Sequence, residues 1–203
     1  MTPLFPRWTT RPWLLVVTLV LIVHCLPGYD RAAALGRRGD ATGQPAQIGA
    51  QPGGAQLPAP VAEVRDAILS AVRSGRIEDL AAPIEWNELK PTIADTPVDD
   101  PIAYWKKISG DGEGREILAI LGEILEAGHV ALPLGKDIEN NKMYIWPAFA
   151  EMPLDKLTPD QEVRLYRLVK PDEVKAMRQK KKWTWYRLAI RADGTWHSFQ
   201  KSD

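Results

Sequence analysis

A stretch of low sequence complexity, Leu35 to Pro60, limits folding to the part of the chain that follows it. It reads LGRRGDATGQPAQIGAQPGGAQLPAP, and Gly, Pro, Ala and Gln dominate it, so it offers almost no large apolar side chain for burial. Such segments cannot offset the conformational entropy lost on folding and are typical of disordered tethers. We therefore predict a disordered linker over residues 35–60 and one globular domain over residues 61–203, large enough to bury roughly two thirds of its unfolded surface.

The segment before the linker has the features of a secretory signal peptide. Two arginines precede an uncharged apolar run, Trp13 to Val23, and Ala32 and Ala34 have the small-residue spacing that signal peptidase recognises. The run is shorter than the roughly 20 residues needed to span a bilayer. We predict a signal peptide over residues 1–34, cleaved after Ala34, which places the domain in the periplasm or outside the cell with no stable transmembrane span. The alternative is a membrane anchor formed by an uncleaved signal.

Composition excludes several chemistries. The only cysteine, Cys25, lies before the predicted cleavage site, so the exported chain would hold neither a disulfide nor a thiolate metal site. The chain has 26 basic and 26 acidic residues, and removal of the signal leaves it nearly neutral. A nucleic-acid binder carries a strong positive charge, so we expect no nucleic-acid partner.

Periodicity and end signals predict five helices in the domain. Apolar spacing, proline at the first helical position and glycine at the end indicate helices over residues 60–75, 99–108, 115–128, 159–169 and 171–182. Thr158 and Gln161 form a capping box before the fourth helix, in which we expect Val163, Leu165, Tyr166 and Val169 to be buried. Residues 77–80 read as a short helical turn, and residues 83–89 as an extended or irregular segment.

Strand signals occupy the gaps between these helices. The runs HVALPL and KMYIWPAFA, residues 129–134 and 142–150, read as strands around a polar turn, and a hairpin closes the chain. Helices therefore come before and between antiparallel strand pairs. We predict an α+β fold: a single small domain with amphipathic helices packed on an antiparallel sheet that ends in a C-terminal β-hairpin.

The closing hairpin, WTWYRLAIRADGTWHSF, is the candidate binding surface. Side chains alternate along a strand, so Tyr186, Leu188 and Ile190 share one face, which we expect to be core. The other face carries the candidate ligand-binding residues: Trp183, Trp185, Arg187, Arg191 and, in one register, Trp196.

The turn decides that register. A type I′ turn at Asp193 and Gly194 places Trp196 with the arginines and His197 and Phe199 with the core, whereas a type I turn with a glycine bulge at Gly194 reverses this. The second face is either packed under a helix, which we expect for Trp185, or open as a platform. The basic run RQKKKW, residues 178–183, is either a solvated helix end or a contact for an anionic polymer or lipid headgroup.

No catalytic or metal-binding pattern is present. The alternating glycines of SGDGEGRE lack phosphate-loop spacing, and Arg115 stands where a calcium loop needs an oxygen, so this segment reads as a capped turn between helices. His129 and His197 are the only histidines after residue 34, and no metal-ligand spacing connects them. We predict no catalytic residues, no metal and no cofactor, and favour a non-enzyme.

The segments YIWPAFAEMPLDKLTPDQEVRLYRLV and YRLAIRADGTWHSF resemble a group of small exported proteins of alphaproteobacteria with no assigned activity. The resemblance covers most of the chain after Val61 and implies a periplasmic or secreted location but no activity. A more distant likeness to NTF2-like domains rests on early helices and late antiparallel strands ending in DG-x-W. The two helices between Thr158 and Met177 interrupt the strands that such a domain requires.

Three functions remain open from the sequence. The first is an exported, non-catalytic accessory or binding module of the cell envelope, whose partner is envelope polysaccharide or anionic lipid. The second is a small-ligand binding domain with a pocket between helices and sheet. The third is a cell-wall hydrolase that uses two converging carboxylates.

Overall fold

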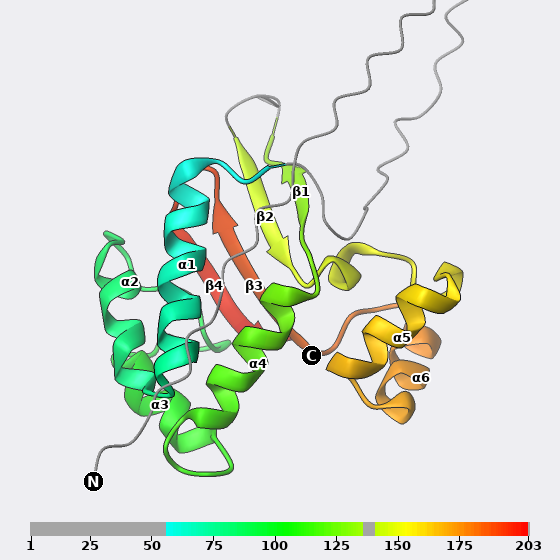
Figure 1. Ribbon diagram of the computed structural model, residues 1–203, viewed down its shortest axis with the longest axis horizontal. Helices are drawn as coiled ribbons and strands as arrows, with labels where there is room; N and C mark the ends of the chain where they lie inside the picture. The colour runs from blue at the N-terminus through cyan, green and yellow to red at the C-terminus, as the bar shows by residue number, and fades with distance from the viewer. Residues whose placement is uncertain (1–55, 136–140, 203) are drawn as a thin grey trace, which may run out of the picture. The chain divides into compact units, whose positions relative to one another are not determined.

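A computed structural model describes residues 56–135 and 141–202, which belong to one unit spanning Ala46–Asp203 (Figure 1). The predicted signal peptide, its Cys25 and the predicted linker up to residue 55 lie outside the described residues. The described α-helices are α1 (Ala59–Ser74), α2 (Ala81–Glu85), α3 (Pro101–Ile108), α4 (Arg115–Glu126), α5 (Pro159–Leu168) and α6 (Pro171–Lys180). The strands are β1 (Val130–Pro133), β2 (Lys142–Trp146), β3 (Tyr186–Arg191) and β4 (Trp196–Lys201). Three short 3₁₀ helices are η1 (Ile77–Leu80), η2 (Ala148–Glu151) and η3 (Leu154–Lys156).

The four strands form one antiparallel sheet in the order β1-β2-β3-β4, so each strand pairs with its neighbour in the chain. Helices α1 and α4 lie across one face of this sheet (Figure 1). The predicted α+β domain with a C-terminal hairpin is therefore confirmed.

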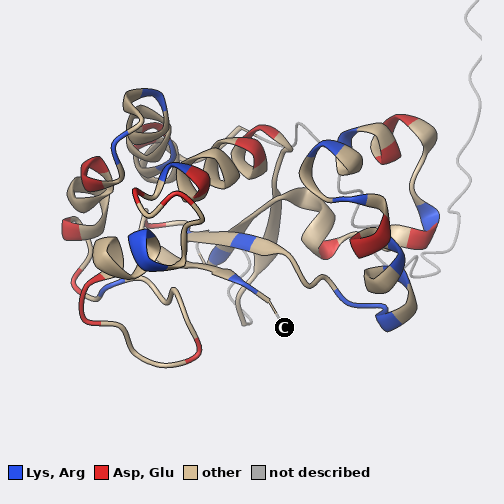
Figure 2. Ribbon diagram, turned by 90° about the horizontal axis from the view of Figure 1, so that it is seen from below, with Lys and Arg blue, Asp and Glu red and all other residues tan. Residues whose placement is uncertain are grey.

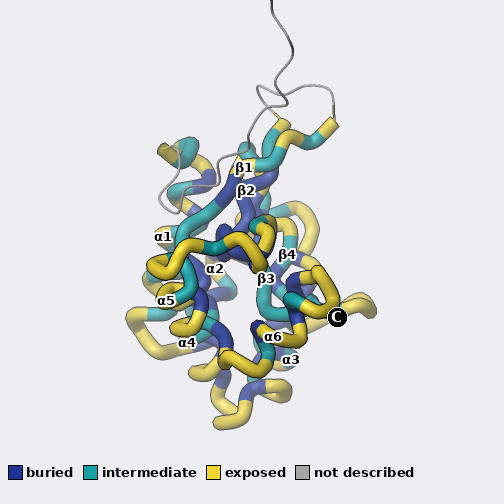
Figure 3. The backbone as a smooth tube through the Cα atoms, turned by 90° about the vertical axis from the view of Figure 1, so that its right-hand side faces the viewer, coloured by how far each residue is buried: buried dark blue, intermediate teal, exposed yellow. Residues whose placement is uncertain are grey.

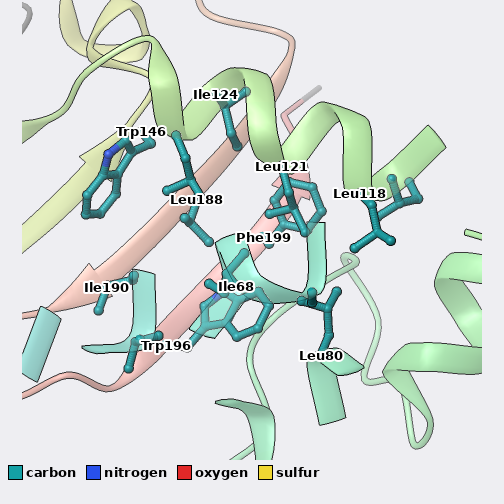
Figure 4. Packing of buried hydrophobic residues seen from close by; sticks show 14 of the residues in the cluster. Ile68, Leu80, Leu118, Leu121, Ile124, Trp146, Leu188, Ile190, Trp196 and Phe199 are labelled. Carbon is teal, nitrogen blue, oxygen red and sulfur yellow. The ribbon is translucent and has the colours of Figure 1, made fainter. Parts of the chain in front are cut away.

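The main core lies between these two helices and the sheet. Ile68 of α1, Leu121 of α4 and Leu188 of β3 are each fully buried in it. Figure 4 shows Leu121 and Ile124 pointing from α4 toward the strand that carries Leu188. The apolar spacing of both helices therefore marks their inward face, as the sequence pattern predicts.

The closing hairpin combines features of both predicted registers. Its turn is of the type I kind, because the N–H of Gly194 donates to the carbonyl oxygen of Arg191 over 2.9 Å and only Gly194 has a positive φ there, of 89°. Ile190 therefore pairs with Trp196, but a bulge follows, and Ala189 pairs with Ser198. The bulge leaves His197 without a partner in the register. After it the alternation of side chains between the two faces is shifted by one residue, so Phe199 lies on the same face as Trp196. As a result, both Trp196 and Phe199 are fully buried in the core.

Three local predictions are wrong. Residues 83–85 of the predicted irregular segment belong to α2, because η1 leads directly into this helix and Pro83 lies in its first turn, where no N–H is needed. Residues 86–89 are irregular, as predicted. The second strand ends at Trp146, and the residues after Pro147 form η2. Val163 and Tyr166 on α5 are 57% and 41% exposed, because they lie away from the face that carries the fully buried Leu165.

The segment between α3 and α4 is the predicted capped turn. The carboxylate of Asp111 accepts hydrogen bonds from the N–H groups of Glu113, Gly114 and Arg115, over 3.1–3.2 Å, and from the hydroxyl of Ser109. These bonds hold the pKa of Asp111 below its usual value. The carboxylate of Asp111 therefore satisfies N–H groups of the turn and the first N–H group of α4, that of Arg115.

A second, smaller core lies beneath α5 and α6. Phe149, Leu165, Met177 and Trp183 belong to it, and each is at most 8% exposed. Much of the outer surface of these two helices is exposed, as the yellow stretches in Figure 3 show. Among the described residues, no helix combines the length and apolar character needed to cross a membrane.

Candidate functional site

A hollow of about 580 Å³ lies between the η2–η3 segment and the end of α6. We call it the basic hollow because four of its lining residues are basic and two are acidic. It is lined by Phe149, Ala150, Glu151, Met152, Pro153, Leu154, Asp155, Lys156, Met177, Arg178, Lys181, Lys182 and Trp183. Its volume falls within the range of roughly 300–1,000 Å³ that small-molecule sites occupy.

The floor of the basic hollow is fixed by packing. Phe149 and Met177 are at most 1% exposed, and Trp183 is 8% exposed. The indole N–H of Trp183 donates to the carbonyl oxygen of Tyr186 over 3.2 Å, which orients the ring in the segment that connects α6 to the hairpin. A floor of this kind does not need to be ordered when a ligand binds, so less conformational entropy is lost.

Arg178 holds the two walls together. Its Nε–H donates to the carbonyl oxygen of Leu154 in η3 over 2.9 Å, and its guanidinium forms an ion pair with Glu162 of α5. Because Arg178 is already paired on both sides, we assign it a structural role and not ligand binding.

The rim of the basic hollow carries exposed lysines. Lys156 at the end of η3 and Lys181 after α6 are exposed, and within residues 56–135 and 141–202 neither ammonium group has an ion-pair partner. Lys181 adopts a left-handed conformation, with φ of 52°, and closes the helix end through its backbone N–H. Figure 2 shows basic and acidic segments mixed on this right-hand part of the molecule, so the positive character is local to the rim.

A second hollow, of about 410 Å³, lies between α3 and the hairpin, and we call it the aromatic hollow. It is lined by Ile93, Ala94, Asp95, Thr96, Tyr104, Trp105, Ile108, Tyr186, Phe199, Gln200 and Lys201. Trp105 and Phe199 behind it are at most 1% exposed, with ring centroids 5.8 Å apart. Tyr186 stacks on Phe199 at 5.4 Å, so the half-buried tyrosine is an outward extension of a packed aromatic core.

The five residues predicted from the hairpin are not gathered on one surface. Trp183 lines the basic hollow, whereas Trp196 is fully buried and stacks on Trp105 of α3 at 5.9 Å. Trp185 is half-buried, with the ammonium of Lys201 4.9 Å from its ring centroid. Arg187 pairs with Glu151 over 2.6 Å, and Arg191 is exposed at the end of β3.

The structure also adds site residues that sequence reasoning missed. Lys156 is 25 positions before Lys181 in the chain, and Tyr104 belongs to a helix that is far from the hairpin in the sequence. Neither stands in a motif, so only the folded arrangement connects them to the hairpin segment. The lysine run after Arg178 is the one local sequence signal for this site, because it contains Lys181, one of the two exposed lysines of the rim.

The histidines lie apart from both hollows. His129 packs beside the rings of Tyr144 and Trp146, with centroid distances of 5.9 and 5.2 Å, and His197 is exposed at the bulge. Across the described residues, no group of three or more His, Cys, Asp or Glu side chains is arranged to hold a metal ion.

His197 gives the fold a testable pH dependence. Although the residue is exposed in part, the burial of the rest of the side chain lowers the pKa of His197, and the charges of Arg191 and Arg187 lower it further. As the pH falls below the unfolded value of 6.5, the unfolded chain binds more protons than the native chain does. The free energy of unfolding therefore decreases with falling pH until the pH reaches the native pKa of His197. We expect His197→Gln to remove this part of the decrease, measured by urea unfolding at several pH values from neutral to mildly acidic. Parallel curves for the wild type and the variant would contradict it.

Comparison with known proteins gives no further guide to function. No protein-family model matches the chain, and neither a curated protein nor a solved structure matches it. The resemblance to small exported proteins of alphaproteobacteria stays a prediction, and any functional assignment has to come from the geometry of the two hollows.

Proposed function

We propose that the chain is an exported, non-catalytic binding module of the cell envelope, and that it binds an anionic polysaccharide at the basic hollow. The observation that carries this proposal is the pair of exposed lysines, Lys156 and Lys181, on the rim of a hollow with a fixed aromatic and aliphatic floor. Ammonium groups bind carboxylates and phosphates as flexible point charges. Export and an envelope location are part of the proposal and are supported by the signal-like N-terminus.

A polysaccharide is favoured over a membrane surface by the character of the rim. The large hydrophobic side chains that the described residues expose are Trp86, Leu89, Ile108, Val163 and Tyr166. None of these lines the basic hollow, so its rim offers nothing large and apolar to insert among acyl chains.

The acidic residues of the hollow favour binding over hydrolysis. Glu151 is paired over 2.6 Å with Arg187, which does not line the hollow, and Asp155 is exposed to solvent. A hydrolase would need two carboxylates facing one bond, with one of them kept protonated by its surroundings. The polysaccharides used in the binding test below also test the hydrolase and the small-ligand alternatives.

The test uses polygalacturonate, a carboxylate-bearing polysaccharide, with neutral dextran for comparison. We expect the full chain to bind polygalacturonate and not dextran, and added salt to weaken binding because the rim charges are exposed. The double variant Lys156→Gln, Lys181→Gln should bind roughly tenfold more weakly, since two exposed charge contacts are worth about 1.4 kcal/mol together. Isothermal titration calorimetry measures both effects.

The matched control removes the same number of lysine charges from α6, outside the hollow. Lys175 and Lys180 are exposed and do not line the hollow, so Lys175→Gln, Lys180→Gln should leave the affinity unchanged. An equal loss in both double variants would mean that only net charge matters and would reject the hollow as the site. Binding to phosphatidylglycerol vesicles but not to polygalacturonate would replace the polysaccharide by a membrane surface, and release of reducing ends would make the chain a hydrolase.

A further inference from the structure

We propose that the aromatic hollow is a second binding site, which takes an uncharged sugar ring of a glycan chain. The inference rests on the proposed function for the choice of a glycan, but the site shares no lining residue with the basic hollow. The two hollows adjoin neighbouring parts of one segment, because Trp183 lines the first and Tyr186 lines the second.

The aromatic side chains of this hollow are held in place before a ligand arrives. Tyr186 is stacked on Phe199, and Phe199 packs in turn against Trp105 with ring centroids 5.8 Å apart. Tyr104 lies one residue before Trp105 on α3 and is half-buried at the hollow. The C–H faces of a sugar ring pack favourably on aromatic faces, which carry partial negative charge.

The polar side chains at the hollow suit hydroxyl groups. Thr96, Tyr104 and Tyr186 carry hydroxyls that both donate and accept, Asp95 only accepts, and the ammonium of Lys201 only donates. Burial raises the pKa of Tyr186, with a further contribution from Glu116, so its phenol is protonated at neutral pH. A sugar ring presents several hydroxyls that must each donate and accept, and a mixed set of this kind satisfies them.

Charge separates this hollow from the basic one. One acidic residue, Asp95, and one basic residue, Lys201, line the aromatic hollow, so its formal charge is balanced. The Lys201 ammonium is also placed over the Trp185 ring, 4.9 Å from its centroid. A strongly anionic group therefore gains little electrostatic attraction here, whereas an uncharged sugar ring needs no charged partner.

The test uses uncharged oligosaccharides, chitotetraose, cellotetraose and maltotetraose, which do not probe the basic hollow. In saturation-transfer NMR with the full chain, we expect at least one of the three to bind at millimolar concentration. Tyr104→Ala should weaken that binding roughly tenfold, because an aromatic contact of this kind is worth about 1.4 kcal/mol. Thr96→Val, in an exposed segment, should weaken it severalfold and covers the case in which Tyr104→Ala fails to fold.

The matched control is Tyr166→Ala, which removes a 41% exposed tyrosine on α5 that does not line the hollow. Unchanged binding in this control, together with loss in the hollow variants, supports the proposal. Failure of all three oligosaccharides to bind, or equal binding by Tyr104→Ala, Thr96→Val and the wild type, overturns it. Neither result affects the polygalacturonate test, so the two proposals fail separately.

Discussion

Replacement of Trp196 by alanine is expected to lower the free energy of unfolding by about 3–5 kcal/mol. Trp196 is fully buried, stacks on Trp105 at 5.9 Å and lies among the core residues shown in Figure 4. Its removal leaves a large apolar cavity that the surrounding core fills only in part. It also removes the hydrogen bond that the indole N–H donates to the carbonyl oxygen of Ser198 over 3.3 Å. Urea denaturation followed by circular dichroism measures the change.

The matched control is the same substitution at an exposed site. Trp86 is 59% exposed after α2, so Trp86→Ala should change the free energy of unfolding by less than about 1 kcal/mol. Equal melting of both variants, or a Trp196→Ala protein as stable as wild type, would contradict the described hairpin register.

Gly114→Ala is expected to be the most damaging glycine substitution in the turn between α3 and α4. Gly114 has φ of 81°, a conformation that costs an L-residue about 1–2 kcal/mol. A Cβ there would lie 2.8 Å from Cβ and Cγ1 of the fully buried Ile77, and such overpacking costs about 1–3 kcal/mol more. We expect a combined loss of about 2–5 kcal/mol, measured by thermal and urea unfolding.

Gly112→Ala separates the two causes. Gly112 has φ of 68°, and no atom lies within 4 Å of the position its Cβ would take. It should therefore show the conformational cost without the clash, and be clearly less destabilised than Gly114→Ala. An equal loss of stability in the two variants would contradict the close contact between Gly114, which precedes α4, and the side chain of Ile77.

The sequence predicts the helix ends well where a single residue controls them. Thr158 accepts from the N–H of Gln161 over 3.3 Å, and the Gln161 side chain accepts from the N–H of Thr158 over 2.8 Å, which is the predicted capping box. Gly75 ends α1 in the left-handed conformation, with φ of 68°, as its position after the apolar run indicates. These signals are local, so they can be read without the fold.

The hairpin and the hollows depend on contacts that alternation does not contain. Trp196 and Phe199 are three positions apart, so a regular strand places them on opposite faces, and only the bulge at His197 buries both. The rim of the basic hollow likewise joins Lys156 to Lys181 through the packing of η3 against α6, which the Arg178 bond to Leu154 maintains. Tertiary packing sets both features, and no short motif encodes them.

The central claim, that the basic hollow binds an anionic polysaccharide, is tested most directly by mapping the bound ligand on the protein. We would titrate the ¹⁵N-labelled full chain with short oligogalacturonates and follow the amide resonances by NMR. The account predicts progressive, saturable shifts at Lys156, Lys181 and Trp183, which line the hollow, and no shift at Trp86. Shifts confined to other surfaces, or none at saturating ligand, would contradict it.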